Sequence, residues 1–532
     1  MILIRCPSVI RLSPFQVLLS AGCVSAAASM GCSSPANQPV AIVLDVPNGP
    51  LEPTGAATVA LTLHSLTNND SIFRTANISA SGAFDVGDIP KTETGRLEAA
   101  MRSESGALVG YGRSVEVVKF DNGGEAVVPV RRPMLYLGTG KSTFTAPNGS
   151  DPETGNWETQ PTVVADFSPG GTPFNGTRLT TTAGYLVAAA GTIYGLQQSI
   201  DASGVGTGAV TLVEIKSEDH AVGAPRTTGI TGDVREAVGS DDGEEIAVAT
   251  ADGAWLVHVA TGATDRLATG PYDRITIRDI GADNTKHEVI VLSSRVGNAS
   301  NCTATAKLER ITITGDTPNK TLIAMGPISD LTTANGRVFF SNVCTGKISE
   351  VTATATTDIR MNVGHPTNIV ASDTQIWFSE LRDSASPTFA ISSLVLSTND
   401  PPRLLWQTPA TLLLVTSEIQ GVQRILQPDT AELDELTLIS NEFVGLRTRT
   451  TYDEPRLTNL PRTAAESDIT RVILAGTGAV VTEYQSWCKV LQACSGIGND
   501  VCGWSCANTG AQRPSVGNEH RIRSLAATFQ RR

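Results

Sequence analysis

Cysteine is the residue type with the most chemical options in this chain, and its spacing limits them. Six cysteines lie in the second half of the chain: Cys302, Cys344, Cys488, Cys494, Cys502 and Cys506. The last four are separated by gaps of five, seven and three residues, whereas structural zinc sites use tighter cysteine pairs. Cys502 and Cys506 are also one residue too far apart for a CxxC redox pair. The spacing favours disulfides in an oxidising compartment, and the last four cysteines allow three pairings.

The histidines do not complete a metal-binding pattern. They are His64, His220, His258, His287, His365 and His520. No two of them have the HxH or HExxH spacing of zinc hydrolases. A single histidine at a strand border is usually a surface residue or a satisfied polar residue. We therefore predict no catalytic, cofactor-binding or metal-ligating residue and no cofactor.

The acidic run Asp241–Glu245 precedes a predicted strand. Its oxygens could bind calcium, but the DxDxDG spacing of calcium loops is absent, so we interpret the run as a solvated hairpin tip. The chain also lacks the GxSxG elbow of serine hydrolases and the GxxxxGKS loop of nucleotide-binding proteins.

Residues 1–31 have the anatomy of an export signal. Arg5 and Arg11 precede a short apolar run, no acidic residue occurs, and the run ends at Gly31–Cys32. The run is shorter than the roughly 20 residues of a membrane-spanning helix. The segment resembles bacterial lipoprotein signals, in which a small residue precedes the acylated cysteine. That resemblance implies lipidation of Cys32, with Cys23 as a second candidate, and the alternative is an ordinary cleaved signal.

The same resemblance implies a cell-envelope location. Ser33 follows Cys32, as in lipoproteins sorted to the outer membrane, so we expect an outer-membrane lipid anchor on the periplasmic or surface face. Residues 32–40 would form a polar tether. The formal net charge of −13 repels phosphate backbones, so we expect no nucleic-acid partner.

The composition predicts an all-β protein, since Val, Thr, Ile and Gly abound and long helical patterns are almost absent. Residues 41–133 read as short alternating strands and predict a small β-sandwich. Residues 81–90 and 95–106 resemble carboxypeptidase-regulatory, transthyretin-like modules, which implies a structural or adhesive spacer. Residues 134–180, rich in Gly, Pro, Asn and Thr, predict a linker with entry strands.

Residues 181–532 are repetitive. Strongly apolar strands begin at Glu245, Glu288, Arg337 and Gln375, in steps of 43, 49 and 38 residues. This loose period is typical of propeller blades, which stack because one blade cannot cover both of its faces. We predict a β-propeller of about seven blades, closed by pairing of the chain ends, with the C-terminal cysteines in a disulfide-stapled loop.

Two of these repeats resemble NHL-type and streptogramin-lyase-like propellers, through GRVFFSNVCTGKISEV and TQIWFSE. Catalysis in the lyases uses histidine and acidic residues with a metal. Glu380 is followed by Leu381 and Arg382 without a nearby histidine in the sequence, which disfavours a lyase. Cys302 and Cys344 fall in adjacent repeats, so a disulfide between them would cross-link neighbouring blades and stabilise the fold by about 3–4 kcal/mol.

Two function classes follow. The first is a non-enzymatic envelope lipoprotein whose propeller face binds an envelope protein or glycan. The alternative is an extracytoplasmic propeller hydrolase or lyase, lactonase-like, with a metal in the central channel. Converging Asp, Glu, Asn or His side chains at the channel mouth would favour the enzyme, and a lining of Thr, Ala and Val would favour the binding module.

Overall fold

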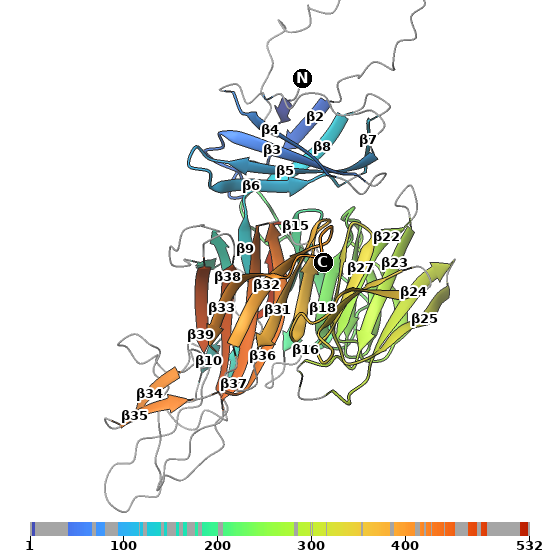
Figure 1. Ribbon diagram of the computed structural model, residues 1–532, viewed down its shortest axis with the longest axis vertical. Coiled ribbons are helices and arrows are strands. Elements are labelled where there is room, and N and C mark those ends of the chain that lie inside the picture. Colours follow the sequence, from blue (N-terminus) through green and yellow to red (C-terminus); the bar gives the residue numbers. More distant parts are fainter. Residues whose placement is uncertain are drawn as a thin grey trace, which may run out of the picture. The chain divides into compact units, whose positions relative to one another are not determined.

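The computed structural model consists of strands and turns in the part of the chain that it describes (Figure 1). The described residues are 3–5, 41–65, 71–79, 84, 94–115, 117–120, 125–139, 143–145, 156–158, 163–166, 176–178, 184–200, 206–280, 286–297, 299, 302–314, 317–352, 355–382, 388–409, 415–419, 422–426, 428–440, 442–452, 467–475, 480–486 and 522–529. Within these ranges no helix is long and apolar enough to cross a membrane. The chain forms two compact units, Met1–Arg132 with Ser217–Asp219 and Pro133–Lys216 with His220–Arg532. The all-β prediction is confirmed.

The first unit is one curled mixed sheet. Its strands are, in spatial order, β1 (Leu3–Arg5), β2 (Ala41–Asp45), β8 (Glu125–Arg131), β6 (Leu108–Arg113), β5 (Thr94–Arg102), β3 (Thr58–Ser65) and β4 (Ser71–Asn77), with β7 (Val118–Lys119) paired to β5. Leu44 and Val128 share one apolar core with Leu61 and Leu97. The structure therefore differs from the predicted sandwich of two sheets. The pairing of β6 with β8 joins all eight strands in a single sheet.

The second unit contains seven four-stranded sheets among the described residues. From the inner strand outward, blade 1 is β40 (Ile522–Ala527), β9 (Met134–Thr139), β12 (Val163–Asp166) and β13 (Gly176–Arg178), and blade 2 is β14 (Tyr185–Ala189), β15 (Thr192–Ile200), β16 (Gly206–Ile215) and β17 (Arg226–Thr227). Blade 3 is β18 (Val234–Gly239), β19 (Glu245–Thr250), β20 (Gly253–His258) and β21 (Thr264–Thr269), and blade 4 is β22 (Arg274–Ile280), β23 (Lys286–Ser293), β24 (Ala306–Thr314) and β25 (Thr317–Gly326).

The remaining blades follow the same order. Blade 5 is β26 (Ile328–Ala334), β27 (Arg337–Asn342), β28 (Lys347–Val351) and β29 (Thr356–Arg360), and blade 6 is β30 (Pro366–Ala371), β31 (Gln375–Arg382), β32 (Thr388–Val395) and β33 (Arg403–Pro409). Blade 7 is β36 (Pro428–Ser440), β37 (Phe443–Tyr452), β38 (Ser467–Ala475) and β39 (Val480–Ser486). Two hairpins lie outside the blades, β10 (Thr143–Thr145) with β11 (Asn156–Glu158), and β34 (Val415–Ile419) with β35 (Val422–Leu426).

The blades form a closed ring. The inner strands touch in the cyclic order β40, β14, β18, β22, β26, β30, β36 and back to β40. Blade 1 combines the chain's last strand with three strands from residues 134–180, through the antiparallel pairing of β40 with β9. The predicted propeller and its closure are confirmed, with seven blades among the described residues. The ring begins earlier than residue 181, because β9, β12 and β13 of the predicted linker and entry segment belong to blade 1.

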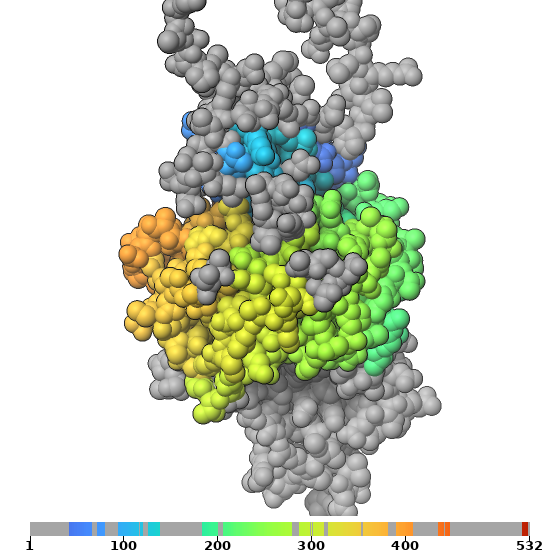
Figure 2. Space-filling model, turned by 90° about the vertical axis from the view of Figure 1, so that its right-hand side faces the viewer, coloured from blue at the N-terminus to red at the C-terminus, as the bar shows by residue number. Residues whose placement is uncertain are grey.

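Packing between blades explains the apolar repeat in the sequence. The repeated strands are β19, β23, β27 and β31, the second strand of blades 3 to 6. A second strand is covered by neighbouring blades on both faces: in blade 5, Phe339 packs with Phe378 of blade 6, and Phe340 packs with Leu292 of blade 4. Figure 2 shows the neighbouring blades packed side by side as one surface from green to orange.

Candidate functional site

One position of the inner strand carries a polar residue in every blade. These residues, which we call the polar ring, are Ser524, Tyr185, Glu236, Arg274, Asp330, Asn368 and Glu435 in blades 1 to 7. In blades 1, 3, 5, 6 and 7 the register shifts directly before this position. Such a β-bulge re-aims the side chain that follows it. All but Arg274 are at most 6% exposed, and the Arg274 side chain is 12% exposed.

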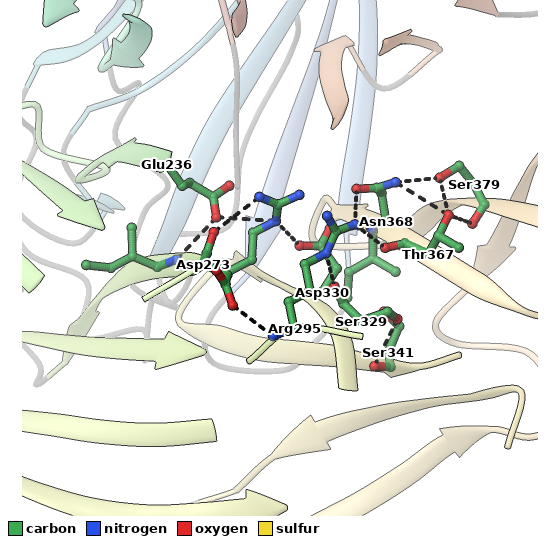
Figure 3. Close-up of polar contacts among 12 residues, drawn as sticks. Glu236, Asp273, Arg295, Ser329, Asp330, Ser341, Thr367, Asn368 and Ser379 are labelled. Carbon is green, nitrogen blue, oxygen red and sulfur yellow. Dashed lines mark hydrogen bonds and ion pairs between the residues drawn. The ribbon is translucent and has the colours of Figure 1, made fainter. Parts of the chain in front are cut away.

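Arg274 joins two acidic members of the ring, Glu236 and Asp330, which Figure 3 labels. Its Nε lies 2.9 Å from Asp330 Oδ1 and 3.6 Å from Glu236 Oε2. Burial by itself lowers the pKa of Arg274, but the Asp330, Tyr185 and Glu435 side chains outweigh that effect and raise it above its ordinary value. Arg274 is therefore a permanent cation between blades 3 and 5.

The ring side chains also accept hydrogen bonds from backbone amides of the next blade. Ile275 N–H donates to Glu236 Oε2 at 3.2 Å, and Ile369 N–H donates to Asp330 Oδ2 at 2.9 Å. Ser524 Oγ accepts from Leu186 N–H at 2.8 Å. Each contact links one inner strand to the next, so these polar side chains hold the ring in register.

A second arginine ties three blades together beside the ring. Ser294, in the left-handed region at φ 57°, directs the chain after β23 so that Arg295 crosses to blades 5 and 6. Arg295 donates to the Ser329 and Thr367 carbonyls and to Asn368 Oδ1. Its backbone N–H donates to Asp273 Oδ2 at 2.8 Å, and the other Asp273 oxygen pairs with Arg235 at 2.6 Å.

The loop that carries Arg295 is held by a disulfide. Cys302, between β23 and β24, is bonded to Cys344, between β27 and β28. The bond joins blades 4 and 5, as the sequence predicted. Cys488, Cys494, Cys502 and Cys506 lie outside the described residues, as do Cys23 and Cys32.

The histidines fall in four separate settings. His64 lies 3.0 Å from Glu98 inside the first unit, and His220 Nε2 lies 3.5 Å from the Tyr136 hydroxyl. The exposed His365 contacts the Val343 carbonyl through Nδ1 at 2.8 Å. His258 and His287 contact Asp242 and Glu245 of the acidic run, in which Glu244 is exposed and the other four residues are partly buried, so the predicted hairpin tip also makes ion-pair contacts. His520 lies outside the described residues.

The polar ring has the residue types of a metal-binding enzyme channel, but oxygens that would bind a metal already have other partners. Glu236, Asp330, Asn368 and Glu435 stand at equivalent positions, yet Arg274 and backbone amides occupy oxygens of Glu236 and Asp330. A metal that needs those oxygens would have to displace a buried guanidinium, so the residues do not fit a channel metal. Within the described ranges no group of three His, Cys, Asp or Glu residues is arranged to hold a metal ion.

Sequence reasoning did not find the polar ring, although a signal for it exists. In blades 4 to 6 two consecutive polar residues stand directly before an apolar residue of the inner strand, and the second of them is the ring member, as in Arg274–Ile275, Asp330–Leu331 and Asn368–Ile369. The repeat analysis followed the second strands, whose apolar runs are stronger.

Comparisons with known proteins give no family for this chain. No protein-family model matches it, and no curated protein matches it. Solved structures that resemble it include apo AztD from Citrobacter koseri, with 12% identity over 67% of this chain and 98% of that chain and a TM-score of 0.31. A hypothetical selenium-binding protein from Sulfolobus tokodaii has 9% identity over 67% of this chain and 92% of that chain, with a TM-score of 0.29. The WD40 domain of SCAP from fission yeast has 9% identity over 54% of this chain and 61% of that chain, with a TM-score of 0.26. At these TM-scores the likenesses carry no argument, and the ring architecture rests on the chain's own strand pairing.

Proposed function

We propose that this protein is a non-enzymatic binding module of the cell envelope, anchored by lipid on Cys32, whose propeller binds an envelope protein or a glycan. The observation that carries the proposal is the ion-paired Arg274 in the polar ring, 2.9 Å from Asp330. A buried ion pair that also holds backbone amides serves the architecture, because removing either partner leaves an uncompensated charge. Binding is then left to the loops around the ring.

The face that bears the disulfide is the best candidate for binding. It is formed by the loops after the second and fourth strands of the blades, including the β23–β24 and β27–β28 loops that Cys302 and Cys344 join. The disulfide and Arg295 fix these loops before any partner arrives, which lowers the entropic cost of association. Thr303, Thr345 and His365 are exposed on this face.

A matched set of threonine substitutions tests the binding face. A tagged chain is cross-linked in intact cells and purified, and the yield of its main partner is compared for Thr303→Arg, Thr345→Arg and Thr261→Arg. Thr261 is exposed on the opposite face, in the β20–β21 turn. We expect the first two variants to lose the partner and the third to retain it. Equal capture by all three would refute this choice of face.

The lactonase-like alternative would require a metal at the acidic members of the polar ring, and calorimetry tests it. Ca²⁺, Zn²⁺ and Mg²⁺ are titrated into the wild-type protein and into Asp330→Asn. We expect no metal-binding heat that depends on Asp330. Stoichiometric binding that Asp330→Asn abolishes, together with lactone hydrolysis, would replace the proposed binding function with the enzymatic one.

The lipid anchor is tested separately. Cells that express the chain are labelled with a clickable fatty acid, and the label is compared for Cys32→Ser and Cys23→Ser. Loss of label and of membrane association in Cys32→Ser alone is the expected result. Label that survives in Cys32→Ser but not in Cys23→Ser would move the anchor to Cys23.

A further inference from the structure

Five ionisable side chains form a continuous chain of contacts from blade 3 to blade 4, on the face opposite the disulfide. They are, in order of contact, Asp265, His258, Glu245, His287 and Asp242. The first three come from β21, β20 and β19, Asp242 from the β18–β19 turn, and His287 from β23 of the next blade. The chain of contacts therefore crosses the boundary between two blades.

His258 is placed between two carboxylates. Its Nδ1 lies 3.2 Å from Glu245 Oε1 and its Nε2 lies 3.0 Å from Asp265 Oδ2. A neutral imidazole has one N–H, so one of its nitrogens would face an anionic oxygen with a lone pair; an imidazolium donates from both nitrogens. The geometry at His258 thus suits the protonated ring.

His287 is placed in a similar way and is more buried. Its Nε2 lies 3.4 Å from Glu245 Oε2 and 3.6 Å from Asp242 Oδ2, and its side chain is 13% exposed. Glu245 Oε2 is buried and accepts no hydrogen bond of ordinary geometry among the described residues. A cation on His287 would compensate that oxygen, since an ionised carboxylate in a buried position needs a charged partner.

The surrounding charges are mostly negative. Asp241 and Glu244 stand in the same turn as Asp242. Burial is the largest cause of the raised pKa of Glu245; charge on His287 and His258 opposes the rise, and Asp242 and Glu244 add to it. Two imidazolium rings would therefore offset both the free-energy cost of burying these carboxylates and their mutual repulsion.

We propose that His258 and His287 form a proton-operated clasp, which fixes the β18–β19 turn of blade 3 to β23 of blade 4 in mild acid and loosens above neutral pH. The clasp forms in mild acid, where imidazole takes up a proton while the carboxylates remain ionised. Most of the effect comes from His287, because the Asp265 side chain is 66% exposed and solvent screens its pairing with His258.

Amide hydrogen exchange of the turn, residues 240–245, tests the clasp. Exchange is measured on the full chain at pH 5.5 and 7.5 and corrected for the intrinsic pH dependence of exchange. We expect several-fold stronger protection at pH 5.5 in the wild type, and no such difference in the His258→Gln/His287→Gln variant. His365→Gln is the matched control, because His365 is an exposed histidine of the same propeller whose Nδ1 contacts the Val343 carbonyl and not the five residues of the clasp. This variant should behave as wild type.

Two exchange results would overturn the clasp: equal corrected protection at both pH values in the wild type, or an undiminished pH difference in the double variant. If the double variant fails to fold, Asp242→Asn serves instead, because it removes one anion facing His287. NMR titration of the two imidazoles gives an independent readout. Both rings should shift in the pH range in which the turn gains protection, and rings that stay neutral throughout that range would refute the proposal.

Discussion

The carboxylate of Glu236 accepts a hydrogen bond from the backbone amide of Ile275, one blade further around the ring, at 3.2 Å. Asp330 repeats the contact with Ile369 at 2.9 Å, and Arg274 lies between the two carboxylates. The same side chains thus provide both the amide contacts between blades and the charge balance of the ring. Because the two roles share atoms, loss of one residue affects several blades.

Substitution of Asp330 by Ala should therefore be severely destabilising. It removes the ion pair with Arg274 and leaves the Ile369 amide without its acceptor. Breaking a buried pair by removing one partner costs about 3–5 kcal/mol. Urea unfolding measures the loss in the free energy of unfolding, and Glu244→Ala, in an exposed turn, should change it by no more than about 0.5 kcal/mol. A similarly small loss for Asp330→Ala would mean that the polar ring does not stabilise the propeller.

The Cys302–Cys344 disulfide should contribute measurably to the stability of the ring. The cysteines are 42 residues apart in the sequence, and loop-closure entropy predicts a loss of about 3–4 kcal/mol on its removal. We expect Cys302→Ser/Cys344→Ser to unfold at lower urea concentration than wild type. Reductant should remove the difference between wild type and variant, because any other disulfides are reduced in both proteins. A variant as stable as the oxidised wild type would contradict this role.

The sequence predicts the propeller because its strongest pattern and its main packing force coincide. Second strands such as β27 and β31 are covered on both faces, so their apolar runs repeat with each blade. The single curled sheet of the first unit was not predictable in the same way. It depends on the pairing of Tyr111 and Gly112 with Arg131 and Val130, and no local pattern specifies that register.

The polar ring and the clasp could not be predicted from the sequence for a different reason. Glu236, Arg274 and Asp330 are far apart in the sequence and meet only because consecutive inner strands touch. His258 and His287 each read as isolated histidines, although both contact Glu245. Sequence spacing identifies sites built within one loop or helix, whereas these clusters are built between blades.

Glu245 should make the stability of the propeller depend on pH. Burial raises the pKa of Glu245 in the folded state. A carboxyl with a raised folded pKa binds its proton more tightly in the folded protein, so its contribution is fully present below the unfolded pKa and is lost as pH rises through the folded pKa. The stability of Glu245→Gln relative to wild type should therefore increase from about pH 4 to pH 7. Urea unfolding of both proteins across this range measures the difference, and a decrease over the same range would contradict the assigned shift.

Gly364, next to His365, is a backbone position at which an added methyl group should be poorly tolerated. Its φ is +86°, and a Cβ there would lie 2.1 Å from Glu380 Oε2. Glu380 is 1% exposed and accepts a hydrogen bond from Ser392 Oγ at 3.1 Å, so its carboxylate cannot move without disturbing a buried contact. Gly270 is the matched control, because its φ is +115° and a Cβ added there would meet no atom within 4 Å. Both alanine variants carry the left-handed backbone penalty of about 1–2 kcal/mol, and Gly364→Ala should lose about 1–3 kcal/mol more through overpacking. Equal losses in the free energy of unfolding would show that the Glu380 side chain moves away from the added methyl group at no cost.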